Sequence, residues 1–205
     1  MAQTEEQAAF ELVDAELNEL WSQVQGVIQD DLYAEYQLGQ QRWLDYRDWY
    51  ATASTGIVEG VTDEELHDSP HYWEQLSLAT SQRIEYLQAW LNTHELDGVF
   101  DPVRPGVWVD GYGGRLSLSL AEDGESFDFE ISVVRGPTWH SGDIAGQIVF
   151  GSQTARYTEE LPTDEVLHLT FIRRGALIEI IGENTNWYHG ARAYFDGTYA
   201  WLGEA

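Results

Sequence analysis

Six histidines are spread along the chain, and two of them stand at a spacing that suits metal binding on one helical turn. His67 and His71 are four residues apart with Asp63 and Asp68 nearby, and imidazole and carboxylate groups are ordinary ligands of divalent ions. A Ser-Pro pair between the two histidines argues against a continuous helix there. We therefore expect no metal site.

The residue types that several other chemistries need are missing or show no pattern. The chain has no cysteine, which excludes disulfides, a thiolate nucleophile and zinc sites with sulfur ligands. It contains no Gly-x-Ser-x-Gly, phosphate-binding or dinucleotide-binding motif. The acidic loops "AEDGE" and "LPTDE" lack calcium-loop spacing, and no carboxylate pair stands out for glycoside hydrolysis. We predict a protein that is not an enzyme, with no catalytic residue and no cofactor.

Two kinds of loop remain as candidate surfaces for binding a partner. Residues 53–70 make a long connection between predicted helices, and long loops on rigid scaffolds often carry binding functions. The acidic candidates in this loop are Glu59, Asp63, Glu64, Glu65 and Asp68. In the C-terminal half the candidates, from "PTWHSGD" and "NTNWYHG", are Trp139, His140, Trp187 and His189. Ordinary loop packing is the alternative interpretation for both sets.

The formal net charge of −26 comes from 36 acidic residues against ten arginines, with no lysine at all. Such a surface repels phosphate backbones and anionic membranes, so nucleic-acid binding is excluded. A carboxylate-rich surface without lysine is typical of proteins that work in high salt. The alternative is that the charge recruits a cationic partner, although at about 1 M salt the Debye length falls to roughly 3 Å and long-range attraction is lost.

Apolar side chains recur at spacings of three and four over residues 4–53, as an amphipathic helix requires. We expect one long helix or two in tandem, with Thr4 and Gln7 as a capping box and Gly26 and Gly39 as weak points. A second helix is predicted over residues 70–92, with a proline in its first turn. Joined by the 53–70 loop, these segments predict an antiparallel helical hairpin.

Beyond about residue 97 the apolar period changes from 3.6 to 2. Segments from "GRLSLSL" to "TYAWLG", with "GQIVFG" among them, alternate apolar and polar side chains and are separated by turns such as "EDGE" and "RRG". Seven or eight short antiparallel strands predict a small barrel or sandwich. The predicted fold class is α+β, with a helical domain over residues 1–97 and an all-β domain over residues 98–205.

The stretch "QQRWLDYRDWY" concentrates aromatic residues and an Arg-Asp pair on one predicted helix. Trp43, Tyr46, Arg47 and Tyr50 stand at spacings of three and four, so they share one face. We expect Arg47 to pair with a carboxylate of the facing helix, and Arg83 to reach back to the first. The stretch is thus interpreted as the seam of a helix pair rather than as an active site.

Several of these elements together resemble the N-terminal domain of the LprI-type lysozyme inhibitors, a family of secreted or lipid-anchored bacterial envelope proteins. The stretches "AELNELWSQV", "GQQRWLDYRDWY" and "ATSQRIEYLQAWL" follow the family pattern in order and spacing. Motif positions to which the resemblance gives a structural role are Trp43, Tyr46, Arg47, Asp48, Thr80 and Arg83. More loosely, "HSGDIAGQIVFGSQTARY" and "GARAYFDGTY" resemble a domain appended to some of these proteins.

The chain departs from the family pattern at the cysteines. Family members usually carry one cysteine after the Tyr-Arg-Asp triplet and another early in the second helix, which implies a disulfide that ties the hairpin. This chain has aromatic residues in those regions, and we expect them to pack in place of the bridge. They are Trp49, Tyr50, Tyr72 and Trp73.

The resemblance implies an exported, non-enzymatic binding protein of the bacterial envelope, which is secreted, periplasmic or at the cell surface. Its candidate target is a cationic lysozyme-type muramidase. The opening "MAQTEEQ" resembles the start of a mature secreted protein, and we expect Met1 to stand where a signal peptide was removed. No apolar run reaches the roughly 20 residues that span a bilayer, so an integral membrane protein is not expected. The alternative is a structural or self-assembling module at the surface of a salt-adapted organism.

Overall fold

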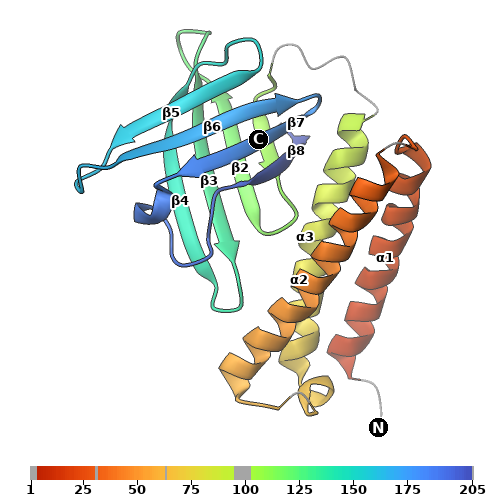
Figure 1. The fold of residues 1–205 in the computed structure, drawn as a ribbon. Helices are drawn as coiled ribbons and strands as arrows, with labels where there is room; N and C mark the ends of the chain where they lie inside the picture. The colour runs from red at the N-terminus through yellow and green to blue at the C-terminus, as the bar shows by residue number, and fades with distance from the viewer. Residues whose placement is uncertain (1–3, 31, 63, 95–102, 205) are drawn as a thin grey trace. The chain divides into compact units, whose positions relative to one another are not determined.

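A computed structural model of the protein describes residues 4–30, 32–62, 64–94 and 103–204. Within these residues three α-helices come first and eight strands follow (Figure 1), which confirms the predicted α+β fold class. The chain divides into two compact units, here called the helical unit (Met1–Leu87 with Gly136–Thr138) and the β unit (Gln88–Arg135 with Trp139–Ala205). The predicted boundary between residues 97 and 98 falls outside the described residues.

The helices are α1 (Glu5–Val27), α2 (Tyr33–Glu59) and α3 (Pro70–His94), with a short 3₁₀ turn, η1 (Leu66–Asp68), before α3. Thr4 caps α1 as predicted, because its hydroxyl accepts a hydrogen bond from the backbone N–H of Gln7 at 3.1 Å. Helix α1 ends one residue after Gly26, whereas Gly39 lies inside α2. Residues 5–59 therefore form two helices in tandem, which was one of the two alternatives expected, and with α3 the unit has three helices.

Contacts between the helices show that consecutive helices are antiparallel, so that α1 and α3 run parallel. Gln25 near the end of α1 donates to the hydroxyl of Tyr33 at the start of α2, at 2.9 Å. Phe10 near the start of α1 lies 5.6 Å from the ring of Trp73, near the start of α3. The phenol of Tyr50 on α2 donates to Gln75 on α3 at 3.0 Å. Each helix thus turns an apolar stripe toward the other two, and each large side chain buried there contributes about 1.5–3 kcal/mol.

None of these helices combines the length and the apolar composition that crossing a membrane requires, as judged over the described residues.

The β unit is a single antiparallel sheet with the strand order β4-β3-β2-β1-β8-β7-β6-β5. The strands are β1 (Gly106–Val109), β2 (Gly114–Leu120), β3 (Phe127–Arg135), β4 (His140–Ile148), β5 (Thr154–Glu160), β6 (Val166–Arg174), β7 (Leu177–Glu183) and β8 (Gly197–Gly203). Two four-stranded meanders are joined where β1 pairs with β8. The sheet curls until its edge strands β4 and β5 come into contact, which makes a nearly closed barrel.

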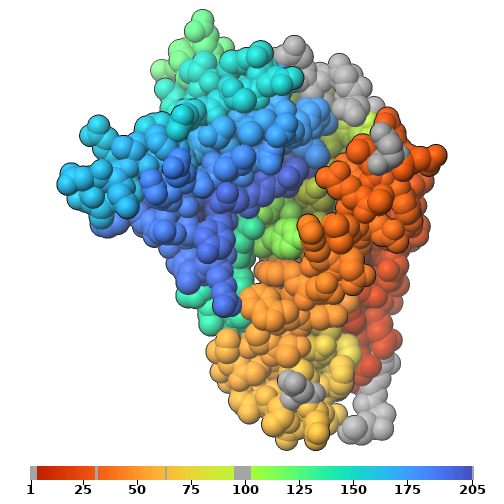
Figure 2. Space-filling view, in the orientation of Figure 1, coloured from red at the N-terminus to blue at the C-terminus, as the bar shows by residue number. Residues whose placement is uncertain are grey.

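Alternating side chains fill the interior of this barrel. Leu116 faces Ile131 and Leu118 faces Phe129 across β2 and β3, and all four are buried, while the residues between them turn outward. An eight-stranded barrel is just wide enough for side chains to fill. The outer surface over β5, β6 and β7 is a continuous layer of side chains (Figure 2).

Side chains, rather than a ladder of hydrogen bonds, close the seam between β4 and β5. The ring of Tyr157 on β5 lies directly against Gly146 on β4, in the space that a Cβ atom on that glycine would occupy. The same ring packs edge-on against Phe129 at 5.1 Å. Glycine is therefore required at position 146, because any larger residue would push the two edge strands apart.

The structure adds one strand to those predicted and moves the start of another. Strand β1 was not among the predicted segments, because four residues are too few to show a period. Strand β4 begins at His140 rather than at Gly146, since its two glycines gave the segment the composition of a loop.

Candidate functional site

Trp43 is the centre of the helical unit, and it is completely buried. The guanidinium of Arg47 lies 5.5 Å from the centre of its ring, and the guanidinium of Arg83 lies at the same distance. Two cations against one aromatic ring each gain about 1 kcal/mol or more when they are shielded from water. Trp43, Arg47 and Arg83, which lie in the stretches that resemble the LprI-type family, thus meet inside the bundle.

Arg83 joins α3 to α2 through an amide. Its Nε and Nη2 both donate to Oε1 of Gln40, at 3.1 and 2.9 Å, and both residues are buried. Its guanidinium also lies 5.0 Å from the ring centre of Tyr86. Arg83 therefore reaches back to the first helical segment as predicted, and the register of α2 against α3 is fixed at this point.

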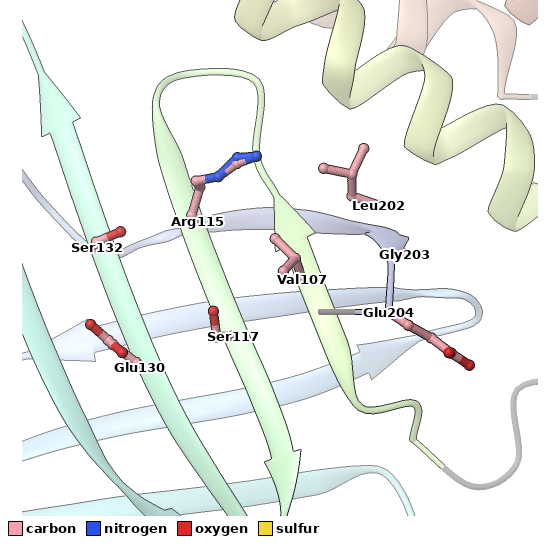
Figure 3. A pocket seen from close by; sticks show the side chains of 8 residues that line it. All are labelled: Val107, Arg115, Ser117, Glu130, Ser132, Leu202, Gly203 and Glu204. Carbon is pink, nitrogen blue, oxygen red and sulfur yellow. The ribbon is translucent and has the colours of Figure 1, made fainter.

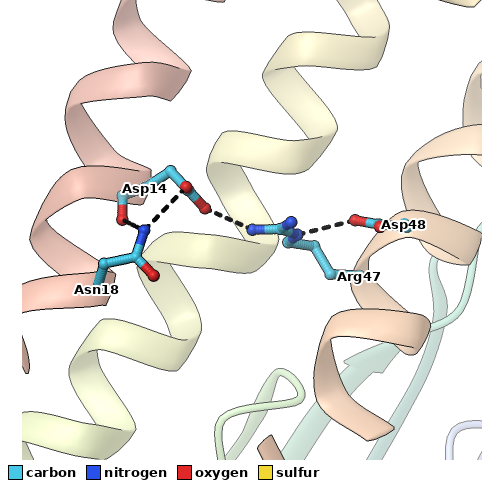
Figure 4. Close-up of polar contacts among 4 residues, drawn as sticks. All are labelled: Asp14, Asn18, Arg47 and Asp48. Atoms are coloured by element: carbon cyan, nitrogen blue, oxygen red, sulfur yellow. Dashed lines mark hydrogen bonds and ion pairs between the residues drawn. The ribbon is translucent and has the colours of Figure 1, made fainter. Parts of the chain in front are cut away.

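Arg47 joins α2 to α1 (Figure 4). Its Nη1 donates to Asp14 at 2.7 Å, and its Nε donates to the neighbouring Asp48 at 3.0 Å. Asn18, one turn along α1, donates to the other carboxylate oxygen of Asp14 at 3.1 Å. The carboxylate that pairs across helices lies on α1 rather than on α3, because residues 5–59 form two helices and α1 packs against α2 at this point.

Two further motif residues, Thr80 and Tyr46, also pack within the helical unit. Thr80 is fully buried on α3, and its hydroxyl has no hydrogen-bond partner among the described residues. The ring of Tyr46 stacks 6.0 Å from that of Tyr50 on the next turn. Tyr50, Tyr72 and Trp73 are buried, as expected for side chains that replace a disulfide, whereas Trp49 is 42% exposed and was wrongly included.

Hydrogen bonds join several described residues of the acidic loop, which we define as residues 59–69. The hydroxyl of Ser69 donates to Glu59 at 2.6 Å. The backbone N–H and the hydroxyl of Thr62 both donate to one oxygen of Glu65, at 3.0 and 2.8 Å, and the backbone bond is the larger of two effects that hold the pKa of this carboxyl below its usual value. Glu64 and Asp68 are exposed. Asp63 lies outside the described residues.

His67 and His71, whose spacing in the sequence suits metal binding, contact different neighbours. His67 packs its ring against those of Tyr72 and Trp73, at 5.5 and 5.7 Å. His71 instead points its Nε2 at the hydroxyl of Ser54, 3.4 Å away on α2. In the part of the chain that the structure describes, no group of three or more His, Asp or Glu side chains is arranged to hold a metal ion.

The structure does bring together the four predicted residues of the β unit. Trp139 immediately precedes β4 and His140 begins it, and the segment of residues 184–196 pairs with that strand through a bridge between Gly142 and His189. Gly190 donates to the carbonyl of Ser141 at 3.0 Å and packs against the ring of His140.

Within this cluster the two tryptophans are exposed and the two histidines are held. Trp139 is 41% and Trp187 is 58% exposed, and Trp139 has a backbone φ of 49°. His189 is fixed by the hydroxyl of Thr185 at 2.9 Å and by the carbonyl of Gly190 at 2.8 Å. The tryptophans offer surface for contact, whereas His189 serves to hold the segment.

Two polar clusters of the β unit were missed from the sequence. Asp110 is buried and accepts hydrogen bonds from the backbone N–H groups of Tyr112 and Gly114, at 2.9 and 2.7 Å. It also forms an ion pair with Arg135. Burial and the nearby Asp110 charge raise the pKa of Tyr199. The signal in the sequence was "DGYGG", an Asp that folds back on its own turn.

The second cluster is a shared carboxylate at the barrel seam. Glu159 on β5 accepts from the phenols of Tyr157 at 2.8 Å and of Tyr188 at 2.6 Å. Burial, followed by the hydrogen bond and the charge of Glu159, raises the pKa of Tyr157 to about 12. No sequence signal links these residues, because the contact joins β5 to the 184–196 segment.

A hollow of about 330 Å³ lies on the outer face of β1, β2, β3 and β8 (Figure 3). Arg115 stands opposite Ser132, and Ser117 stands opposite Glu130, so its floor alternates small hydroxyls and charges. A second hollow lies at one end of the barrel and is described below. The chain matches no family model, no curated protein and no solved structure, so its function is argued from its own residues.

Proposed function

We propose that this chain is an exported, non-enzymatic binding protein of the bacterial envelope, whose acidic loop binds a cationic lysozyme-type muramidase. The observation that carries the proposal is the exposure of four carboxylates in the acidic loop, together with the hydrogen bonds that join its described residues: Glu59, Glu64, Glu65 and Asp68. The resemblance to the LprI-type inhibitors supplies the class of target.

A fixed loop favours binding because fewer side chains have to be ordered when the partner arrives. Glu59 accepts a hydrogen bond from Ser69, and Glu65 accepts one from the hydroxyl of Thr62. These bonds restrain the loop before a partner binds. Trp73 adds a hydrogen bond from its indole to the carbonyl of His67 at 3.1 Å. Preorganisation of this kind lowers the entropic cost of association.

The net charge of −26 supports the same proposal over longer distances. Opposite charges accelerate the encounter of two proteins at low ionic strength, and the acceleration falls steeply as salt is added. Binding by this surface should therefore be strongest in dilute salt and should weaken in molar salt.

The test is the binding of c-type lysozyme to a double variant, Glu64→Gln with Asp68→Asn, in about 0.05 M salt. These two carboxylates are exposed, and the structure gives them no part in holding the loop. Removing two rim charges should weaken binding about fivefold, mainly through a slower association rate.

The matched control is Glu19→Gln with Glu35→Gln, which removes the same charge from exposed positions on α1 and α2. If both double variants weaken lysozyme binding equally, net charge rather than the acidic loop is responsible. If the unmodified chain does not bind lysozyme in dilute salt, the proposed target is wrong.

A structural or self-assembling role is the second candidate, and it is favoured by large apolar side chains that are exposed on the β unit. Val149 is 61% exposed and Ile181 is 46% exposed, on a surface that is otherwise strongly charged. Exposed apolar surface marks a contact with another protein where it forms a contiguous patch larger than a few hundred Å². Light scattering across a range of salt concentrations tests it, and a monomer at every concentration would count against it.

A further inference from the structure

The two ends of the barrel are closed differently. At the end where β3 leads into β4, the 184–196 segment inserts Ala193 and Phe195, which are both fully buried. The carbonyl of Phe195 accepts a hydrogen bond from the buried phenol of Tyr199 at 2.9 Å, which holds this segment in place. At the opposite end, where β2 leads into β3, a hollow of about 340 Å³ remains.

The walls of this hollow are mainly apolar. Val103 and Phe127 are buried, and Phe150 packs edge-on against Phe127 at 6.0 Å and against Phe171 at 6.4 Å. The volume lies at the lower end of the range for small-molecule sites. At about 30 Å³ for each molecule of liquid water, it corresponds to about ten non-hydrogen atoms.

One cation and one anion stand among the residues that line the hollow. Arg173 donates its backbone N–H to Gln153 at 2.8 Å and its Nη1 to the carbonyl of Ser152 at 3.4 Å. These bonds tie it to the turn between β4 and β5, beside the hollow. Glu125, in the turn between β2 and β3, supplies the carboxylate.

We propose that this hollow binds a small molecule that has a short apolar chain and one carboxylate. The chain lies against Val103, Phe127 and Phe150, and the carboxylate meets the guanidinium of Arg173, whose planar fork of donors suits that group. Glu125 opposes the ligand charge and limits the affinity. This site involves neither the acidic loop nor a protein partner, so it goes beyond the proposed function.

The experiment is calorimetric titration of the full chain with octanoate, 1-octanol and octylamine in about 0.1 M salt. Octanoate should bind saturably with one site for each chain, and the alcohol and the amine should bind more weakly. Arg173→Gln should weaken octanoate binding about tenfold, because it removes a charge-assisted hydrogen bond. Glu125→Gln should strengthen it.

Arg174→Gln is the matched control, since it removes the same charge from the next residue. Arg174 is exposed and pairs with Glu179 at 2.8 Å, and it does not line the hollow. Leu120→Trp, at a half-exposed position on the wall, should fill the space and abolish binding without removing a core side chain.

The proposal is overturned if octanoate shows no saturable binding up to about 10 mM, or if Arg174→Gln weakens binding as much as Arg173→Gln does. It is also overturned if Leu120→Trp leaves octanoate binding unchanged, or if octanol binds as tightly as octanoate.

Discussion

Arg83 on α3 and Gln40 on α2 are joined by two hydrogen bonds that end on one oxygen atom, and both residues are buried in the helical unit. A lysine cannot reproduce this fork or its stacking on Trp43. We expect Arg83→Lys to lower the free energy of unfolding by about 2–3 kcal/mol, because it leaves buried polar groups poorly paired. Urea denaturation measures the change.

Arg42→Lys is the control for this prediction, since Arg42 is exposed on the same helix as Gln40. It should change the free energy of unfolding by less than about 0.5 kcal/mol. Equal losses from the two variants would show that Arg83 does not fix the helices in register.

The ion pair between Arg47 and Asp14 should be worth more than the pair between Arg47 and Asp48. The side chain of Asp14 is 33% exposed and that of Asp48 is 61% exposed, so water screens the second pair more strongly. Double-mutant cycles with Arg47→Met should give a coupling of about 1 kcal/mol with Asp14→Asn and close to zero with Asp48→Asn. A coupling with Asp14→Asn that is no larger than the coupling with Asp48→Asn would contradict this prediction.

Local patterns in the sequence predicted most elements, but not the contacts between distant segments. Alternation placed β2 and β6 at their observed starts, because each strand has one face in the core. The break between α1 and α2 carries no proline, so one helix and two remained equally compatible with the period. Composition favoured carboxylates as arginine partners, and the amide of Gln40 was therefore not foreseen.

The candidate surface of the β unit shows the same limit. The segment that contains His189 lies against His140 and Ser141 because Gly142 lets the backbone of His189 approach β4. A glycine within a strand signals such an approach but does not identify the segment that makes it.

Asp110 is expected to be the most sensitive acidic residue of the β unit. Asp110→Asn should lower the free energy of unfolding by about 3 kcal/mol, because Arg135 would then lack its buried counter-charge. Gly114→Ala should also destabilise the barrel, since a Cβ atom there would lie 2.7 Å from an oxygen of Asp110. Glu122→Gln, at an exposed turn, should be neutral in the same thermal unfolding measurement. If Asp110→Asn and Gly114→Ala are as neutral as this control, the cluster has no structural role.

Tyr157 should make the barrel seam sensitive to alkaline pH. Its pKa in the folded protein is about 12, above the value of about 10 in an unfolded chain, so the folded state holds the proton more tightly. The stability that this gives is fully present below pH 10 and is lost as the pH rises toward 12. Tyr157→Phe should therefore lose less stability than the unmodified chain between pH 10 and 11.5, as followed by circular dichroism. Identical pH profiles would contradict the assignment.

Added salt should stabilise the protein. With 36 carboxylates, ten arginines and no lysine, the folded chain repels itself at low ionic strength, and screening relieves that repulsion. Each kcal/mol recovered should raise the unfolding temperature by about 2–4 °C. Sodium chloride, and not only sulfate, should raise the unfolding temperature, which separates charge screening from the salting-out effect of sulfate. A flat or falling unfolding temperature between about 0.05 and 2 M sodium chloride would make salt adaptation the wrong explanation of the composition.

The most direct measurement for the central claim is a titration of c-type lysozyme activity with the purified chain. In about 0.05 M salt we expect inhibition that saturates near one chain for each enzyme molecule, and that weakens at about 1 M salt as attraction between the two proteins is screened. Full lysozyme activity in the presence of a tenfold excess of the chain in dilute salt would contradict the proposed function.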